Sequence, residues 1–260
     1  MTASLETLVI AAYVFADSLS IPRSGPAGKA TDSELIALSV AQAVLGVSSD
    51  RQFLGTVKRL LPGFFPGLPG QSQFNRRLRR LTPQIATVQM MLTELVAEGR
   101  LRLVDGTLIS CANYPGCGSR SHFAGDASYG YCASKSQFVW GMRLVLICDP
   151  KGVPVGYDLV GPKTGEEREC ALRLAAGQAG ALLFADGGFW GREYLASMES
   201  LGIELVTPDK HQLGERPPAE VAKARIRLVI ESVFSTLKRQ MRLEMHLAKT
   251  AAGLAQRIAQ

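Results

Sequence analysis

The chain has 260 residues, of which 47% are hydrophobic and 20% are charged. This composition excludes a wholly disordered protein, because a chain of this length and apolar content can bury a large core. The longest apolar run, Leu8 to Ala16, has nine residues, whereas a membrane-spanning helix needs about 20. No Lys or Arg precedes this run, which argues against a secretory signal. The five cysteines form no Cys-x-x-Cys pair, so we expect reduced thiols, a cytoplasmic location and no membrane contact.

The formal net charge of +6 is concentrated in two segments. The segment from Arg51 to Leu81 has seven basic residues and no acidic one, and the segment from Val221 to Gln260 has eight basic and two acidic residues. These segments carry +7 and +6, so the remaining residues together carry −7. Two basic patches on an otherwise acidic chain favour a polyanionic partner such as DNA. Solvated helix faces are the alternative interpretation.

Residues 1–99 predict an all-helical domain. The sequence from Thr31 to Glu34 is a capping box that opens one helix, and we expect Asp50 to cap the next. Residues 62–70 contain three prolines and three glycines, which predicts a turn. A short basic helix then carries four arginines: Arg76, Arg77, Arg79 and Arg80. Successive short helices with a basic last member predict a helix-turn-helix-like module that binds DNA, although a plain bundle with water-facing arginines gives the same pattern.

Residues 100–260 predict an α/β domain with a mixed sheet. Segments rich in Val, Leu and Ile predict strands at 101–109, 138–148, 153–160, 181–185 and 203–207. Helices are expected at 166–177 and 192–200, and a long final helix at 219–241. Because strands and helices alternate, at least part of the sheet should be parallel.

Three carboxylates in this second domain are candidate site residues. Asp105 lies between apolar residues and precedes Gly106, and Asp186 follows a short apolar strand and precedes two glycines. Each Asp-Gly pair is also compatible with a simple hairpin turn. Glu231 lies on the final helix four residues after Arg227, a spacing that also suits an ordinary surface ion pair.

The three acids together suggest a metal site. Carboxylates at the ends of two strands and on a helix packed against the sheet can converge on one point. Oxygen ligands of this kind suit Mg²⁺ or Mn²⁺, which also accept phosphate oxygens from a substrate. Two such ions about 4 Å apart can activate an attacking hydroxyl and stabilise the leaving oxygen of a phosphodiester.

The motifs around these acids resemble those of the DDE transposases of bacterial insertion sequences. The resemblance lies in residues 103–107 (Leu-Val-Asp-Gly-Thr), in residues 185–189 (Ala-Asp-Gly-Gly-Phe) and in the Arg-x3-Glu-x6-Lys spacing of Arg227, Glu231 and Lys238. Residues 129–144, 31–35 and 65–78 also resemble blocks of one transposase subgroup. The likeness therefore covers nearly the whole chain.

The resemblance implies a fold, a reaction and a set of roles. The fold is an RNase H-like mixed sheet flanked by helices, preceded by the helix-turn-helix-like domain. Asp105, Asp186 and Glu231 are implied as the catalytic and metal-binding triad for Mg²⁺ or Mn²⁺, with two ions. The implied reaction is metal-assisted cleavage at the transposon ends, followed by attack of the freed 3′ hydroxyl on target DNA. The implied DNA-binding residues are Arg227, Lys238, Arg239, Arg76, Arg77, Arg79 and Arg80.

The implied partners are the terminal inverted repeats and target DNA, bound by a homodimer associated with the nucleoid. Two positions depart from the family pattern, since Ala224 replaces a tyrosine and Gly187 replaces a basic residue. Residues 251–258 are expected to begin a helix that continues further in relatives. Two alternatives stay open: a structure-selective nuclease of the same fold, and an inactive DNA-binding remnant of a transposase.

Overall fold

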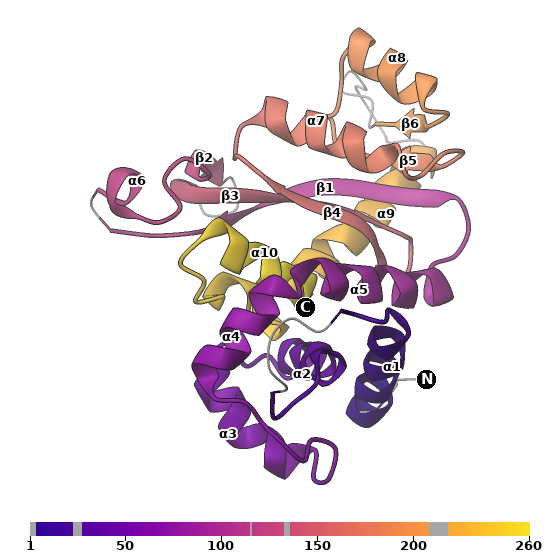
Figure 1. Ribbon diagram of the computed structural model, residues 1–260. Helices are drawn as coiled ribbons and strands as arrows, with labels where there is room; N and C mark the ends of the chain where they lie inside the picture. The colour runs from indigo at the N-terminus through magenta and orange to yellow at the C-terminus, as the bar shows by residue number, and fades with distance from the viewer. Residues whose placement is uncertain (1–3, 23–27, 115, 133–135, 208–217) are drawn as a thin grey trace. The chain divides into compact units, whose positions relative to one another are not determined.

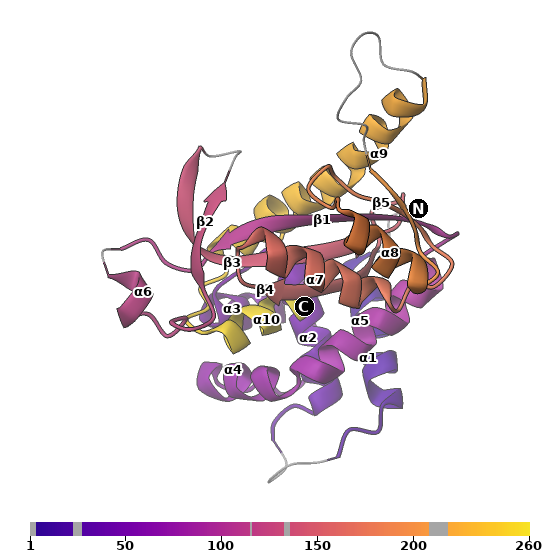
Figure 2. The same cartoon turned by 90° about the horizontal axis from the view of Figure 1, so that it is seen from above.

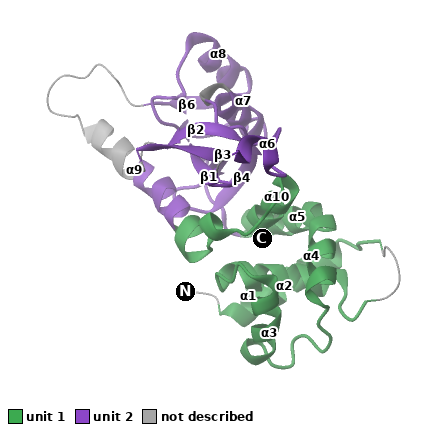
Figure 3. Ribbon diagram, turned by 90° about the vertical axis from the view of Figure 1, so that its left-hand side faces the viewer, with its two compact units in different colours: residues 1–95, 236–260 green, residues 96–235 purple. Residues whose placement is uncertain are grey.

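The chain forms two compact units in a computed structural model that describes residues 4–22, 28–114, 116–132, 136–207 and 218–260 (Figure 1). The side chains of residues 164–165 and 218–226 are outside this description, and with them that of Ala224. Unit 1 comprises Met1–Leu95 and Thr236–Gln260, and unit 2 comprises Val96–Ser235 (Figure 3). The first boundary lies close to the expected one. Residues 236–260, which we expected to continue the second domain, group with the N-terminal helices instead.

Unit 1 is helical, as expected. Its main helices are α1 (Leu5–Ser18), α2 (Asp32–Val44), α3 (Asp50–Leu60), α4 (Gln71–Arg80), α5 (Thr82–Val96) and α10 (Ala251–Ala259). Two short elements, the π-helix η2 (Thr236–Gln240) and the 3₁₀ helix η3 (Leu243–Met245), precede α10. One buried apolar cluster joins α1 to α5 and includes Ala259 of α10. The proline- and glycine-rich segment separates α3 from α4, because its prolines cannot continue a helix.

The start of α2 confirms the capping box, whereas the expected cap of α3 is wrong. Thr31 accepts a hydrogen bond from the Glu34 backbone N–H, and Glu34 accepts one from the backbone N–H of Thr31. In α3 the capping residue is Ser49, whose hydroxyl accepts from the Gln52 N–H. Asp50 is the first helical residue, and its carboxylate points into the unit rather than toward the helix end.

The buried carboxylate of Asp50 links three elements of unit 1. Its side chain is 6% exposed and accepts hydrogen bonds from Gln42 of α2 (2.9 Å), Asn75 of α4 (3.0 Å) and Arg257 of α10. Arg257 also donates to the Ser48 carbonyl oxygen at 3.0 Å. A buried carboxylate requires such partners, because an unpaired charge away from water is strongly unfavourable. The Arg257–Asp50 pair therefore fixes α10 against the N-terminal helices.

Unit 2 is built on a six-stranded mixed sheet. Its strands are β1 (Leu101–Ser110), β2 (Ser128–Cys132), β3 (Gln137–Cys148), β4 (Pro154–Val160), β5 (Leu182–Phe184) and β6 (Glu204–Val206). The order is β2-β3-β1-β5-β6, and β4 also pairs with β3. The β1–β3 and β3–β4 pairs are antiparallel, whereas β1–β5 and β5–β6 are parallel. This mixed sheet confirms the expected α/β class.

Helices cover both faces of this sheet. Helices α7 (Thr164–Ala175) and α8 (Arg192–Ser200) lie on one face, and α9 (Pro218–Ser235) crosses the other (Figures 1 and 2). A short helix, α6 (Cys117–Arg120), lies between β1 and β2. The core under α7 contains Val104, Val145, Ile147, Cys170 and Ala171. Because side chains alternate along a strand, the neighbours of Val104 on β1 point to the α9 face.

We predict that Arg257→Ala lowers the free energy of unfolding of unit 1 by about 3 kcal/mol, because it leaves the Asp50 carboxylate buried without its cation. Urea unfolding monitored by circular dichroism measures the change. Lys249→Ala is the matched control, since Lys249 is an exposed cation of the same segment and its loss should change stability by less than about 0.5 kcal/mol. Equal effects of the two substitutions would contradict a structural role for the pair.

Candidate active site

Asp105 lies inside a continuous strand rather than in a turn. Its Cα partner on β3 is Leu146, and the next residue, Gly106, is opposite Val145. The hairpin alternative for this Asp-Gly pair is therefore wrong. The long apolar partner β3 keeps β1 extended through both residues, which overrides the local turn preference of Asp-Gly. Asp105 is thus held on the central strand of the sheet.

The parallel pairing of β1 with β5 brings Asp105 and Asp186 together. Leu103 of β1 is opposite Phe184 of β5, and each aspartate lies two residues further along its own strand direction. A step of two residues returns to the same face, and neighbouring strands are about 4.8 Å apart. The two carboxylates therefore lie side by side on the face that α9 crosses.

Backbone hydrogen bonds fix both carboxylates. Asp105 Oδ1 accepts from the Gly106 N–H at 2.7 Å, and Asp186 Oδ1 accepts from the Gly188 N–H at 2.7 Å. The carbonyl oxygen of Asp186 accepts from the Phe189 N–H at 3.1 Å, and the Phe189 side chain is buried in the core under α7 and α8. The turn after β5 is consequently anchored at both ends.

The environment of Asp105 disfavours a negative charge. Burial raises its pKa from 3.8 to about 6, against the lowering effect of the Gly106 hydrogen bond. The nearby carboxylates of Asp186 and Glu167 raise this pKa further, and the Arg227 guanidinium lowers it. A divalent cation between the two aspartates would relieve this repulsion. Carboxylate oxygens are the ligands that Mg²⁺ and Mn²⁺ prefer, so the pair fits such an ion, with water and phosphate oxygens as further ligands.

Helix α9 supplies Arg227 and Glu231 on the same side of the sheet. It packs against β1, and the Arg227 Nη2 atom lies 4.0 Å from Glu231 Oε1. The Glu231 side chain is 55% exposed. Within the described part of the chain, no three His, Cys, Asp or Glu residues form a group that could hold a metal ion. The structure thus brings together two of the three predicted acids, and the metal-binding role of Glu231 stays a prediction.

Lys238 and Arg239 lie beyond α9, in the π-helix η2. The predicted long helix therefore ends as an α-helix at Ser235, and its 3.6-residue periodicity does not extend to Lys238. Arg239 is exposed. Both residues group with unit 1, whereas Glu231 groups with unit 2.

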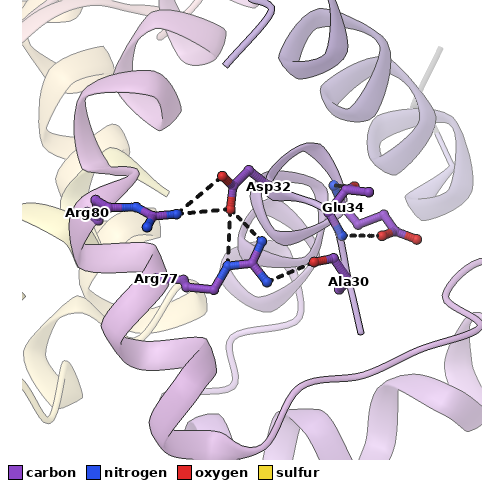
Figure 4. Close-up of polar contacts among 6 residues, drawn as sticks. Ala30, Asp32, Glu34, Arg77 and Arg80 are labelled. Carbon is purple, nitrogen blue, oxygen red and sulfur yellow. Dashed lines mark hydrogen bonds and ion pairs between the residues drawn. The ribbon is translucent and has the colours of Figure 1, made fainter. Parts of the chain in front are cut away.

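The four arginines of α4 have different environments. Arg77 donates through Nε and Nη2 to Asp32 Oδ1, at 3.1 and 2.5 Å, and through Nη1 to the Ala30 carbonyl oxygen at 2.7 Å (Figure 4). Arg80 also contacts Asp32, at 3.3 Å. Arg76 and Arg79 are exposed, and neither has an ion-pair partner among the residues that the structure describes. Arg77 therefore serves the packing of α4 on α2.

Two residues of α7 near the aspartates were missed by the sequence analysis. Glu167 is buried and accepts a hydrogen bond from Arg143 Nη1 of β3 at 2.7 Å. Burial raises the pKa of Glu167, and the Arg143 charge lowers it. The next residue, Arg168, donates from Nε to the Gly188 carbonyl oxygen at 2.7 Å. Charged residues near the start of a helix are common on protein surfaces, so the sequence did not distinguish these two.

Comparisons with known proteins give one family match and several solved structures. The family model of the Transposase DDE domain matches residues 97–259. Curated protein sequences give no significant match. Similar solved structures include a Mos1 transposase paired-end complex (13% identity, TM-score 0.27, covering 92% of this chain and 77% of that one) and the Mos1 strand transfer complex (11%, 0.27, 94% and 98%). Because these TM-scores are low, the family assignment is based on the family match alone.

Among the described residues, no helix has both the length and the apolar character to cross a bilayer.

We predict that Asp105→Asn stabilises the metal-free protein at high pH. The folded-state pKa, about 6, lies above the ordinary value of 3.8, so the carboxylate destabilises the fold above pH 6 and this penalty disappears as the pH falls toward 4. The gain should approach about 3 kcal/mol at pH 8. Urea unfolding in EDTA at pH 4 and pH 8 measures it.

Glu199→Gln is the control for this experiment, because Glu199 is an exposed carboxylate of the same unit. It should change stability little at both pH values. A gain for Asp105→Asn that is the same at pH 4 and pH 8 would show that charge is not its cause.

Proposed function

The chain belongs to the family of transposase DDE domains, and from this membership we propose that it cleaves DNA at the ends of an insertion sequence and joins the freed 3′ hydroxyl to target DNA. Enzymes of this family are nucleases and DNA strand transferases. The observation that carries the proposal is the side-by-side placement of Asp105 and Asp186 beneath the helix that supplies Arg227 and Glu231.

DDE transposases use divalent metal ions, and we assign Asp105 and Asp186 as the ligands of Mg²⁺ or Mn²⁺ in this protein. Glu231 is the third ligand of the proposal, and two ions are expected. The ions would supply activation of the attacking hydroxyl and charge stabilisation at the leaving oxygen. The backbone and side chains of this protein would hold these carboxylate oxygens in place for the metal ions.

Arg227 has a double role in this proposal. In the structure its guanidinium lies 4.0 Å from Glu231, and its charge lowers the pKa of Asp105. DNA brings phosphates that compete for its guanidinium, which forms strong paired hydrogen bonds with phosphate. When Arg227 turns to a phosphate, Glu231 is released to join Asp105 and Asp186. Lys238 and Arg239 are proposed as further phosphate contacts near the scissile bond.

Unit 1 is proposed to bind the terminal inverted repeats. Arg76 and Arg79 are the arginines of α4 assigned to phosphate contacts, with Arg80 at the edge of the same surface. The exposed basic residues of α3, Arg51, Lys58 and Arg59, extend the positive charge. Arg77 has a structural role instead, since Asp32 and Ala30 occupy its guanidinium. A homodimer that binds both ends and acts on DNA in the cytoplasm completes the proposal.

We predict that Asp105→Asn, Asp186→Asn and Glu231→Gln each lower Mg²⁺-dependent nicking and joining by about 1,000-fold, because each removes a proposed metal ligand worth several kcal/mol of charge stabilisation. The assay uses DNA that carries the ends of the element, with Glu199→Gln as the active control. Full activity of Glu231→Gln would show that Glu231 is not a metal ligand.

The same assay distinguishes the two alternatives. A structure-selective nuclease would cut branched DNA without the repeats and would not join strands. A binding remnant would hold the ends tightly at low salt and give no metal-dependent product. Both outcomes would contradict the transposase proposal.

We also predict that Arg76→Ala and Arg79→Ala weaken end binding and each reduce the slope of log K against log salt concentration by about 1, as expected for one lost phosphate contact. Arg77→Ala should instead lower the melting temperature, because it leaves Asp32 with fewer partners. Filter binding at several salt concentrations and thermal unfolding separate the two effects. A salt slope that changes only in Arg77→Ala would reverse the assignment.

A further inference from the structure

Two consecutive residues of α7, Glu167 and Arg168, reach the strand segments that hold the two aspartates. Helix α7 covers the face of the sheet opposite α9 (Figure 2). Neither side chain therefore lies where substrate DNA would bind in the proposed function. Each one contacts a glycine close to one aspartate: Gly106 follows Asp105 directly, and Gly188 is two residues after Asp186.

Arg168 acts on Asp186 through the backbone of one residue, Gly188. Arg168 Nε donates to the Gly188 carbonyl oxygen at 2.7 Å, and the Gly188 N–H donates to Asp186 Oδ1 at 2.7 Å. A Cβ at Gly188 would lie 2.8 Å from Asp186 Oδ1, so a larger residue there would displace this carboxylate. The Arg168 guanidinium thus holds Gly188 in place, and Gly188 in turn orients the Asp186 carboxylate.

Glu167 acts beside Asp105 in a similar way. Its carboxylate lies against the backbone of Gly106, and a Cβ at that position would overlap it. Arg143 holds this carboxylate with Nη1 and also donates from Nη2 to the Pro162 carbonyl oxygen at 3.2 Å, which ties the start of α7 to β3. The side chains of Arg143 and Glu167 are only 16% and 9% exposed. A buried ion pair adds little net stability compared with apolar packing. Stability alone therefore does not explain why the Arg143–Glu167 pair lies beside Asp105.

We propose that Arg168 and Glu167 are positioning residues, which hold the Asp105 and Asp186 carboxylates at the geometry that a divalent cation requires. This inference rests on the proposed function, in which the two aspartates bind the metal. Ligating carboxylates are commonly oriented by outer partners, and loss of such a partner lowers metal affinity or activity about 10- to 100-fold. The contacts of Arg168 and Glu167 give α7 this function from the face that DNA does not reach.

The charge of Arg168 makes a discriminating test possible. If Arg168 affected the site only through its positive charge, Arg168→Ala would increase the affinity of the acidic pair for Mn²⁺, because a repelling cation is removed. If Arg168 positions Asp186, the same substitution lowers the affinity. The two explanations therefore predict changes of opposite sign.

The experiment measures Mn²⁺ binding to the full-length protein by isothermal titration calorimetry, together with kcat and KM for end cleavage. We expect Arg168→Ala to weaken Mn²⁺ binding about 10- to 100-fold and to lower kcat with little change in the KM for DNA. Arg168→Lys keeps a donor and should recover part of the affinity. Arg173→Ala is the matched control, since Arg173 is an exposed arginine of the same helix that pairs with Asp158 on the surface.

The outcomes separate this inference from the function on which it rests. Asp186→Asn must weaken Mn²⁺ binding if the proposed function is correct, and unchanged binding would refute that function. If Asp186→Asn weakens binding while Arg168→Ala leaves it unchanged or strengthens it, the positioning role is refuted and the metal site stands. Thermal unfolding of each variant verifies that it is folded at the assay temperature, and Arg168→Lys provides the test if Arg168→Ala does not fold.

Discussion

Strand β1 pairs in parallel with β5 and antiparallel with β3, and this double pairing determines where the proposed catalytic residues lie. The parallel register sets Asp105 beside Asp186 although 81 residues separate them in the chain. The antiparallel partner β3 keeps the Asp-Gly pair extended and carries Arg143 toward Glu167. A shift of one residue in the β1–β5 register would turn one aspartate to the opposite face of the sheet. The acidic pair therefore depends on strand pairing before it depends on any side-chain contact.

The two faces of the sheet contribute different residues around Asp105 and Asp186. On one face, α9 presents Arg227 and Glu231, which lie 4.0 Å apart and are partly exposed to solvent. On the other face, α7 presents Glu167 and Arg168, whose hydrogen bonds are made within the fold. The pKa of Asp105 is raised first by burial and then by the nearby carboxylates of Asp186 and Glu167. Perturbed pKa values of this kind are characteristic of active sites, where residues are arranged to bind a ligand at some cost to the stability of the fold.

Much of this architecture could be predicted from the sequence, because it follows from local patterns. The capping box at Thr31 and the apolar strand segments gave correct elements, and the order of those elements gave the mixed sheet. The failures in the predicted side-chain roles have a common physical cause, since the partners of these side chains are distant in sequence. Asp50 was expected to cap its own helix but pairs with Arg257. In the sequence Arg77 resembles the other three arginines of α4, and only its contact with Asp32 distinguishes it. Glu167 and Arg168 carried no local signal, because their roles come from glycines on β1 and in the turn after β5.

The contact between Asp50 and Arg257 has a consequence for the order of folding during synthesis. The two residues are 207 positions apart, and all of unit 2 lies between them, so unit 2 is in effect an insertion within unit 1. A ribosome that adds about 5 to 20 residues per second needs on the order of 10 to 40 s to make that stretch. Throughout this interval the emerging helices of unit 1 contain a core carboxylate without its cation. The basic helices at the start of the chain therefore reach their final stability only after the strands with the two aspartates have been made.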